Sequence, residues 1–135
     1  MIECIYIQSH KMEIVKRLPE FLSTLSKHNL SIPVYLFLNS ISLEMDISFL
    51  DTYKGLLTDI IYIDDNVEYN KVTYMFYKIL KTHLKYQYIL LLETDCILLD
   101  NFLVELNKDI INRSFILYGS RYYGICDWAN YNTLT

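Results

Sequence analysis

The stretch YQYILLLETDCILLDNFL, residues 86–103, joins a strongly apolar segment to two acidic side chains. Its continuous run of apolar residues at 88–93 predicts a strand that is covered on both faces, as in a parallel sheet. The run ends in Glu93-Thr94-Asp95. Because a carboxylate is costly to bury unless it is paired, hydrogen-bonded or bound to a metal, two acids in this position need a structural or a chemical reason.

Segments of the same kind recur along the chain, with helical patterns between them. Four further apolar runs predict strands, at 3–8, 33–38, 59–64 and 114–119. Helices are predicted between and after them, at 11–29, 47–57, 70–85 and 100–110, the last opened by Asp100 or Asn101. This alternation predicts an α/β fold with a mainly parallel sheet flanked by helices and joined by right-handed crossovers.

Length and composition narrow the class of protein. The chain has 135 residues, 53% of them hydrophobic and 21% charged, which predicts one globular domain over residues 1–135. The net charge is −4, with Lys and Arg scattered, which argues against nucleic acid as a partner because phosphate binding needs a concentrated basic face.

Three cysteines without a CxxC pair favour reduced thiols. No apolar run approaches the roughly 20 residues of a membrane span, and the N-terminus lacks the basic region of a signal peptide, so we predict no membrane segment and a cytoplasmic location.

Polar residues follow every predicted strand, and ligands of parallel α/β sheets bind beyond these strand ends. The strand exits are Gln8-Ser9-His10, Asn39-Ser40, Asp64-Asp65-Asn66, Glu93-Thr94-Asp95 and Gly119-Ser120. The sequence contains no GxGxxG turn, P-loop, GxSxG elbow or HExxH. Neither a glycine loop for phosphate nor a histidine-based zinc site is therefore indicated.

The acidic exit has the chemistry of a site for a hard divalent cation. Two acids separated by one residue project to the same side of an extended backbone. Mg²⁺ and Mn²⁺ favour carboxylate oxygens, and Mg²⁺ commonly uses one or two of them together with substrate phosphates. Glu93 and Asp95 are therefore candidate ligands for Mg²⁺ or Mn²⁺ beside a nucleoside diphosphate.

At 86–103 the sequence resembles nucleotide-sugar-dependent glycosyltransferases of the GT-A fold, in which an apolar strand ends in DxD or a variant such as ExD. Here the motif is Glu93-Thr94-Asp95, and the helical segment 70–80 resembles the helix that precedes the motif in that family. The resemblance implies a Rossmann-like nucleotide-diphospho-sugar transferase fold whose nucleotide-binding part spans this chain. It also implies that the acceptor-binding half is missing at the C-terminal end.

The resemblance further implies transfer of a sugar from a nucleoside-diphosphate sugar, UDP- or GDP-linked, to a hydroxyl of a glycan, protein or lipid acceptor. Asp95 would be the main metal ligand, and Glu93 would contact the sugar, the ribose or a metal-bound water. Asn39 would face the base, where the family often has an acid, and Lys71 would approach the phosphates. The exit of the first strand, which would lie against the base or the ribose, consists of Gln8, Ser9 and His10.

Other interpretations of the same residues stay open. Glu93 and Asp95 could belong to an acidic turn that caps the next helix, and Lys71 could be an ordinary surface lysine. The chain could bind nucleotide without transferring a sugar, and no catalytic base is identified. A phosphoacceptor or phosphatase-type domain is a third possibility, although such domains need their acids at the first strand exit.

Overall fold

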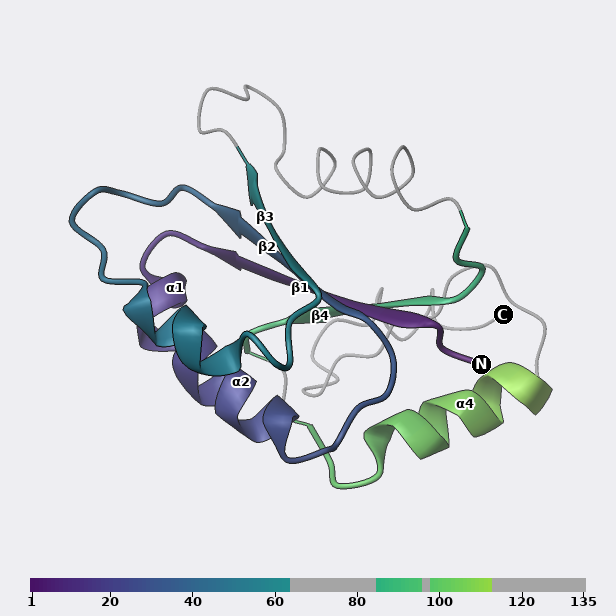
Figure 1. Cartoon of the computed structure of the whole chain (residues 1–135). Coiled ribbons are helices and arrows are strands. Elements are labelled where there is room, and N and C mark those ends of the chain that lie inside the picture. The colour runs from purple at the N-terminus through teal and green to yellow at the C-terminus, as the bar shows by residue number, and fades with distance from the viewer. Residues whose placement is uncertain (64–84, 96–97, 113–135) are drawn as a thin grey trace, which may run out of the picture. The chain divides into compact units, whose positions relative to one another are not determined.

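The computed structural model describes residues 1–63, 85–95 and 98–112 (Figure 1). They fall into two compact units. One lies within Ile2–Asp100 and holds a β-sheet, and the other comprises, among the described residues, Met1 and 101–112. The strand predicted at 114–119 lies outside the described residues. So does the helix predicted at 70–85, except for Lys85, which is in a turn.

The sheet of the first unit has four strands, all parallel, in the order β3-β2-β1-β4. Their bounds are β1 Cys4–His10, β2 Val34–Asn39, β3 Asp59–Ile63 and β4 Ile89–Glu93. The chain therefore builds the sheet outward from β1 to β3 and then returns to the opposite side of β1 for β4. This arrangement confirms the predicted α/β class and its parallel sheet.

Two short helices connect β1 to β2, where the sequence pattern had predicted a single helix over 11–29. They are α1, Glu13–Lys16, and α2, Leu18–Ser26. Pro19 lies at the start of α2 and has no N–H to donate to the carbonyl four residues earlier. The break falls at Arg17, whose φ of −117° departs from helical values.

A 3₁₀ helix, η1, spans Ser48–Tyr53 between β2 and β3. It contacts α2, and Figure 1 shows α1, α2 and η1 together on one side of the sheet. The 47–57 prediction is therefore confirmed in position, but the element is shorter and more tightly wound.

Alternation along the strands gives the sheet two apolar faces. On one face, the Tyr6 ring stacks on Tyr35 with centroids 5.1 Å apart and contacts Phe37 at 5.3 Å. This cluster contains no residue of α1 or α2. The helices therefore cover the other face, where their buried side chains meet buried aliphatic side chains of β1 and β2: Ile5, Ile7, Ile14, Leu18, Leu22, Leu25, Val34, Leu36 and Leu38.

The pairing of β1 with β4 is reinforced at their amino ends. The Glu3 N–H donates to the Tyr88 carbonyl at 2.9 Å. The Glu3 carboxylate accepts from the backbone N–H of Gln87 at 2.5 Å and of Tyr88 at 3.4 Å. These bonds help to set the register with which β4 runs alongside β1.

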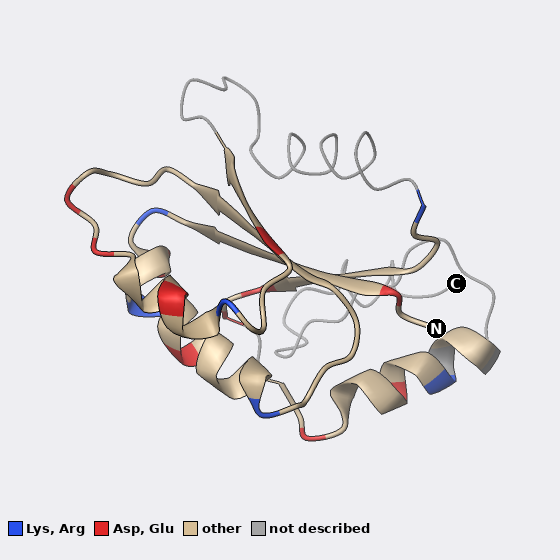
Figure 2. Cartoon of the chain, viewed as in Figure 1, with Lys and Arg blue, Asp and Glu red and all other residues tan. Residues whose placement is uncertain are grey.

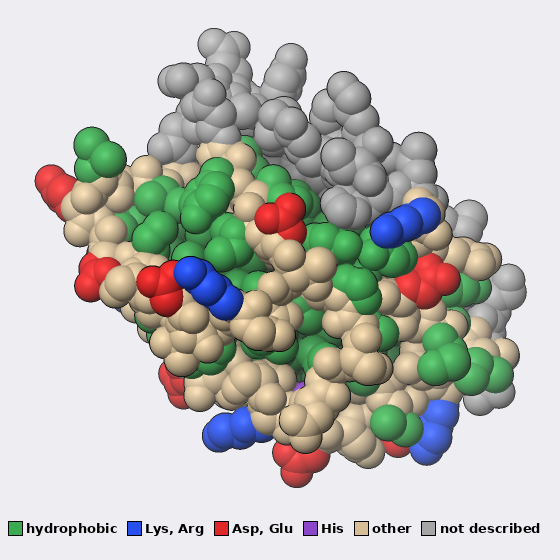
Figure 3. Space-filling model, in the orientation of Figure 1, with side chains coloured by type: hydrophobic (Ala, Val, Ile, Leu, Met, Phe, Trp, Pro, Cys, Tyr) green, Lys and Arg blue, Asp and Glu red, His purple; other side chains and the backbone are tan. Residues whose placement is uncertain are grey.

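Charged and apolar side chains are distributed differently over the surface. Figure 2 shows Lys and Arg interspersed with Asp and Glu along the described ribbons. Figure 3 shows apolar side chains gathered at the surface beside β2 and β3. On β3, Tyr62 is 59% exposed, so the edge of the described sheet keeps apolar surface.

Within the described residues, no helix has both the length and the apolar character needed to cross a membrane.

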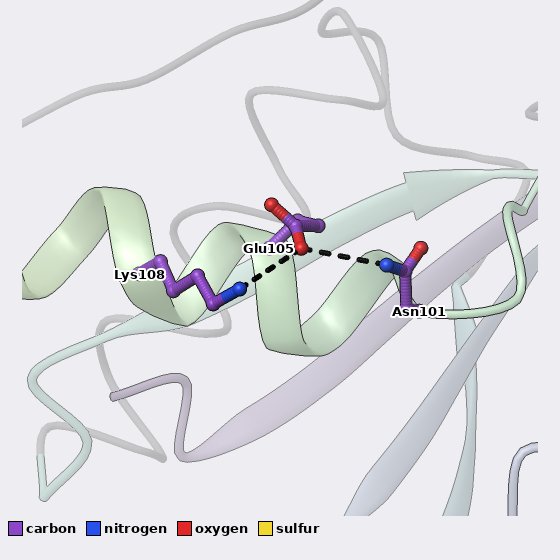
Figure 4. Close-up of polar contacts among 3 residues, drawn as sticks. All are labelled: Asn101, Glu105 and Lys108. Carbon is purple, nitrogen blue, oxygen red and sulfur yellow. Dashed lines mark hydrogen bonds and ion pairs between the residues drawn. The ribbon is translucent and has the colours of Figure 1, made fainter.

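The second unit contains α4, Phe102–Asn112, close to the 100–110 prediction. Asn101 precedes the helix, and its carbonyl accepts the Glu105 N–H at 3.1 Å. The Glu105 carboxylate accepts from Asn101 Nδ2 at 3.4 Å and from Lys108 Nζ at 3.2 Å (Figure 4). These contacts join successive turns of one exposed helix face.

Candidate ligand site at the carboxyl edge of the sheet

The strand order creates a reversal point at β1. The chain leaves β1 toward β2, whereas β4 lies on the opposite side of β1. In open α/β sheets, such a reversal leaves a crevice beyond the carboxyl ends of the two strands, and ligands bind there. A ligand site is therefore expected at the exits of β1 and β4.

The register places four predicted site residues in two cross-strand pairs. Gln8 of β1 pairs with Glu93 of β4, and His10 of β1 pairs with Asn39 of β2. Because side chains alternate along a strand, Gln8 and His10 share a face. Gln8, His10, Asn39 and Glu93 consequently belong to one face of the sheet, at its carboxyl edge.

The acidic turn exposes its carboxylates and buries the residue between them. Glu93 is the last residue of β4, and Thr94 and Asp95 form the turn that follows. Glu93 and Asp95 are exposed, whereas Thr94 is only 7% exposed. The two carboxylates thus stay hydrated at the edge of the sheet, so they do not carry the free-energy cost of burying a charge.

No ion pair among the described residues involves Glu93 or Asp95. The ion pairs of this part of the chain use other acids: Glu13, Asp51 and Glu105. In residues 1–63, 85–95 and 98–112, no group of three or more His, Cys, Asp or Glu side chains could hold a metal ion. A pair of carboxylates suits Mg²⁺ or Mn²⁺ that takes its remaining ligands from water and phosphate, but not a zinc ion held by three or four side chains.

Buried polar atoms without partners collect at the same edge. Ser9 is fully buried and Asn39 is 1% exposed. Within the part of the chain that the structure describes, Ser9 Oγ, both polar atoms of the Asn39 amide and Thr94 Oγ1 have no hydrogen-bond partner. Buried polar side-chain atoms are normally hydrogen-bonded in native proteins, so the partnerless atoms at these three neighbouring strand ends are candidates for bonds to a ligand or to a bound water.

The backbone turns sharply at two of these strand ends. Lys11 follows β1 with φ of 51°, and Ser40 follows β2 with φ of 58°. Both are in the left-handed region, which non-glycine residues seldom occupy and which is often found at functional sites. The Lys11 N–H donates to the Asn39 carbonyl at 3.2 Å, so the two exits are tied together.

His10 lies at the border between the strand exit and α1. Its side chain is 45% exposed, and Nδ1 is 3.8 Å from Glu13 Oε2. Glu13 Oε1 is also 3.6 Å from Arg17 Nη1. His10 is thus partly engaged with the first turn of α1, while Gln8 and Ser9 are more deeply set.

The structure brings most of the predicted residues to one edge of the sheet. Gln8, Ser9, His10 and Asn39 lie at the ends of adjacent strands β1 and β2, and Glu93 and Asp95 lie at the end of β4 on the other side of β1. Lys71 lies outside the described residues. Sequence reasoning assigned no role to Thr94, although alternation between two exposed acids could have indicated its burial.

Comparison with protein-family models finds none that matches the chain, and comparison with curated proteins finds no match either.

Proposed function

We propose that this chain is the nucleotide-sugar-binding part of a GT-A-type glycosyltransferase, which transfers a sugar from a nucleoside diphosphate to an acceptor hydroxyl. One observation carries the proposal. The acidic pair at the end of β4 lies beside the exit of β1, where the strand order reverses. That is where α/β sheets bind ligands, and the residues there have the chemistry that a metal-bound diphosphate needs.

Glu93 and Asp95 would hold Mn²⁺ or Mg²⁺, because both carboxylates are exposed and neither forms an ion pair with another described residue. The bound cation supplies positive charge that neutralises the diphosphate leaving group. The chain's own contribution would be two exposed carboxylates, one on the last residue of β4 and one in the turn that follows.

Asn39 and the exit of β1 would bind the nucleoside. The Asn39 amide offers one acceptor and two donors, and both of its polar atoms are buried without a partner among the described residues. A base edge could take up these bonds. Ser9 and Gln8 add neutral polar groups to the same edge, which suits a ribose or a base better than a second phosphate.

The first experiment is thermal unfolding with UDP, GDP, CDP or ADP, each with and without Mn²⁺. We expect one diphosphate to stabilise the wild type only when Mn²⁺ is present. A ligand that binds only the native state, at a hundred times its dissociation constant, adds about 2.7 kcal/mol. Asp95→Asn removes a carboxylate charge and should abolish the shift.

Asp51→Asn is the matched control, because Asp51 is an exposed acid of η1 that pairs with Lys54 at 3.1 Å. It should leave the shift unchanged. If no diphosphate stabilises the wild type at millimolar concentration, the proposed donor site is wrong. If a diphosphate binds but its sugar conjugate is neither transferred nor hydrolysed, the chain binds donor without catalysis.

A further inference from the structure

Thr94 separates the two acids of the turn and differs from both of them in burial. Glu93 and Asp95 are exposed, whereas Thr94 is 7% exposed and its Oγ1 has no partner among the described residues. A buried hydroxyl without a partner lowers stability through its desolvation cost. An apolar side chain would fill the position without that cost, so the hydroxyl needs an explanation.

Ser9 presents the same problem on the neighbouring strand. Its side chain is fully buried, and its Oγ also lacks a partner in the described part of the chain. Gln8 pairs with Glu93 at the end of the β1–β4 ladder, so Ser9, still within β1, and Thr94, the first residue of the turn after β4, each follow that pair. Two partnerless hydroxyls thus lie at the carboxyl end of the β1–β4 pair, and one of them, that of Thr94, stands between the two acids in sequence.

The spacing of strands suggests how both hydroxyls are satisfied. Neither hydroxyl bonds to the other in the structure, and adjacent strands lie about 4.8 Å apart. One water molecule that bonds to both oxygens spans such a gap, and buried waters typically connect polar groups of this kind. A shared water would tie the turn after β4 to the exit of β1.

We propose that Thr94 is a positioning residue: a buried water bridges its Oγ1 to Ser9 Oγ and fixes the turn so that Glu93 and Asp95 stay directed to the open edge. The bridge itself stands on the burial of the two hydroxyls and on the β1–β4 pairing, which ends one residue before each of them. Its consequence for metal binding rests on the proposed function. Thr94 acts through its neighbours and is not itself a metal ligand.

The bridge is tested by urea unfolding of Thr94→Val, Ser9→Ala and the double variant. If one water serves both hydroxyls, each single substitution leaves the other hydroxyl poorly satisfied and lowers stability. The second substitution then costs less than it does alone, because neighbouring groups that share a partner are not additive. If instead each single variant equals or exceeds the wild type in stability, there is no bridge, because removing a partnerless hydroxyl is not destabilising.

The positioning role is tested by the dissociation constant for Mn²⁺, measured from the electron paramagnetic resonance signal of the free ion. Substitutions that release metal ligands from their supporting bonds typically weaken affinity 10–100-fold, so we expect about a tenfold loss in Thr94→Val. Thr94→Ser keeps the hydroxyl and should bind Mn²⁺ like the wild type.

Thr58→Val is the matched control, because Thr58 Oγ1 accepts the Val34 N–H at 3.1 Å at the amino end of β2. It should lower stability and leave Mn²⁺ affinity unchanged. Unchanged affinity in Thr94→Val, with a wild type that binds Mn²⁺, overturns the positioning role and leaves the proposed function intact. A wild type that binds no Mn²⁺ overturns the metal site and the positioning role together, and the unfolding data then decide the bridge alone.

Discussion

Asn39 is the residue whose environment is hardest to explain by folding alone. It ends β2, it is 1% exposed, and neither amide atom has a partner among the described residues. Leaving a buried polar group unsatisfied costs about 1–3 kcal/mol. A residue kept at such a cost is typical of a site whose ligand makes the missing bonds, and stability is often lost where function requires it.

Asn39→Val should therefore separate stability from binding. Valine suits a strand and removes the partnerless amide, so we expect the free energy of unfolding in urea to equal or exceed that of the wild type, by up to about 1 kcal/mol. Binding of the preferred diphosphate with Mn²⁺ should weaken at least about tenfold, or 1.4 kcal/mol, by isothermal titration. Asn39→Asp buries a carboxylate and should destabilise the protein. A loss of more than about 2 kcal/mol in Asn39→Val would indicate that the amide has a structural partner.

At the scale of elements, α2 holds the helical layer against the sheet. It is short, and isolated helices of this length are marginal in water, so its stability comes from packing of one face. Phe21, Leu22 and Leu25 supply that face and are buried. The break at Arg17 separates α2 from α1 in the connection between β1 and β2.

Leu22→Ala should show how much this layer contributes. Leu22 is fully buried, and truncating such a side chain typically costs about 2–5 kcal/mol through lost burial and the cavity left behind. Urea unfolding followed by circular dichroism measures the change. Leu43→Ala is the control, because Leu43 is fully exposed in the loop after β2 and should change stability by less than about 0.5 kcal/mol. Equal effects of the two substitutions would contradict the described packing of α2.

Across the whole molecule, several ionisable groups are buried in neutral form on the aromatic face of the sheet. Burial, with a smaller contribution from the nearby Glu3 carboxylate, raises the pKa of the Cys4 thiol to about 12. Burial, and then the hydrogen bond between the Tyr35 and Tyr86 hydroxyls at 2.9 Å, raises the pKa of Tyr35 to about 12. The pKa of Tyr6 is raised as well, mainly by burial.

Raised pKa values of these acids predict unfolding at alkaline pH. Below the ordinary thiol value of 9.0, the groups are protonated in both states and their contribution to stability is complete. As pH rises toward 12, the unfolded chain loses protons that the native state retains, so stability falls. Urea midpoints from pH 8 to 11 should therefore decrease.

Cys4→Ala should reduce the slope of stability against pH by the equivalent of up to one bound proton. The reason is that the substitution removes a group that, in this pH range, loses its proton in the unfolded chain and keeps it in the native state. Ile7→Val provides the comparison, since Ile7 is equally buried on β1 and does not titrate. It should lower the midpoints by a similar amount at every pH. A Cys4→Ala profile parallel to that of the wild type would contradict the raised thiol pKa.

Local pattern was sufficient for the class of fold and for the location of most elements. Continuous apolar runs indicate strands covered on both faces, and all four described strands lie within two residues of their predicted bounds. The pattern did not reveal the break at Arg17, because apolar spacing continues across α1 and α2, while Pro19 acts through a backbone hydrogen bond that spacing does not show.

The candidate site depends on both levels. The amino-acid pattern alone indicates that acids follow two of the predicted strands, at 64–65 and 93–95, and that neutral polar residues follow others, because the order of residues is a property of the chain. The position of β4 beside β1 and the pairing of Gln8 with Glu93 become known only from the tertiary structure. The physical reason is that a local apolar run indicates where a strand forms. The order of the strands in the sheet depends instead on long crossover connections and on packing between segments far apart in the chain.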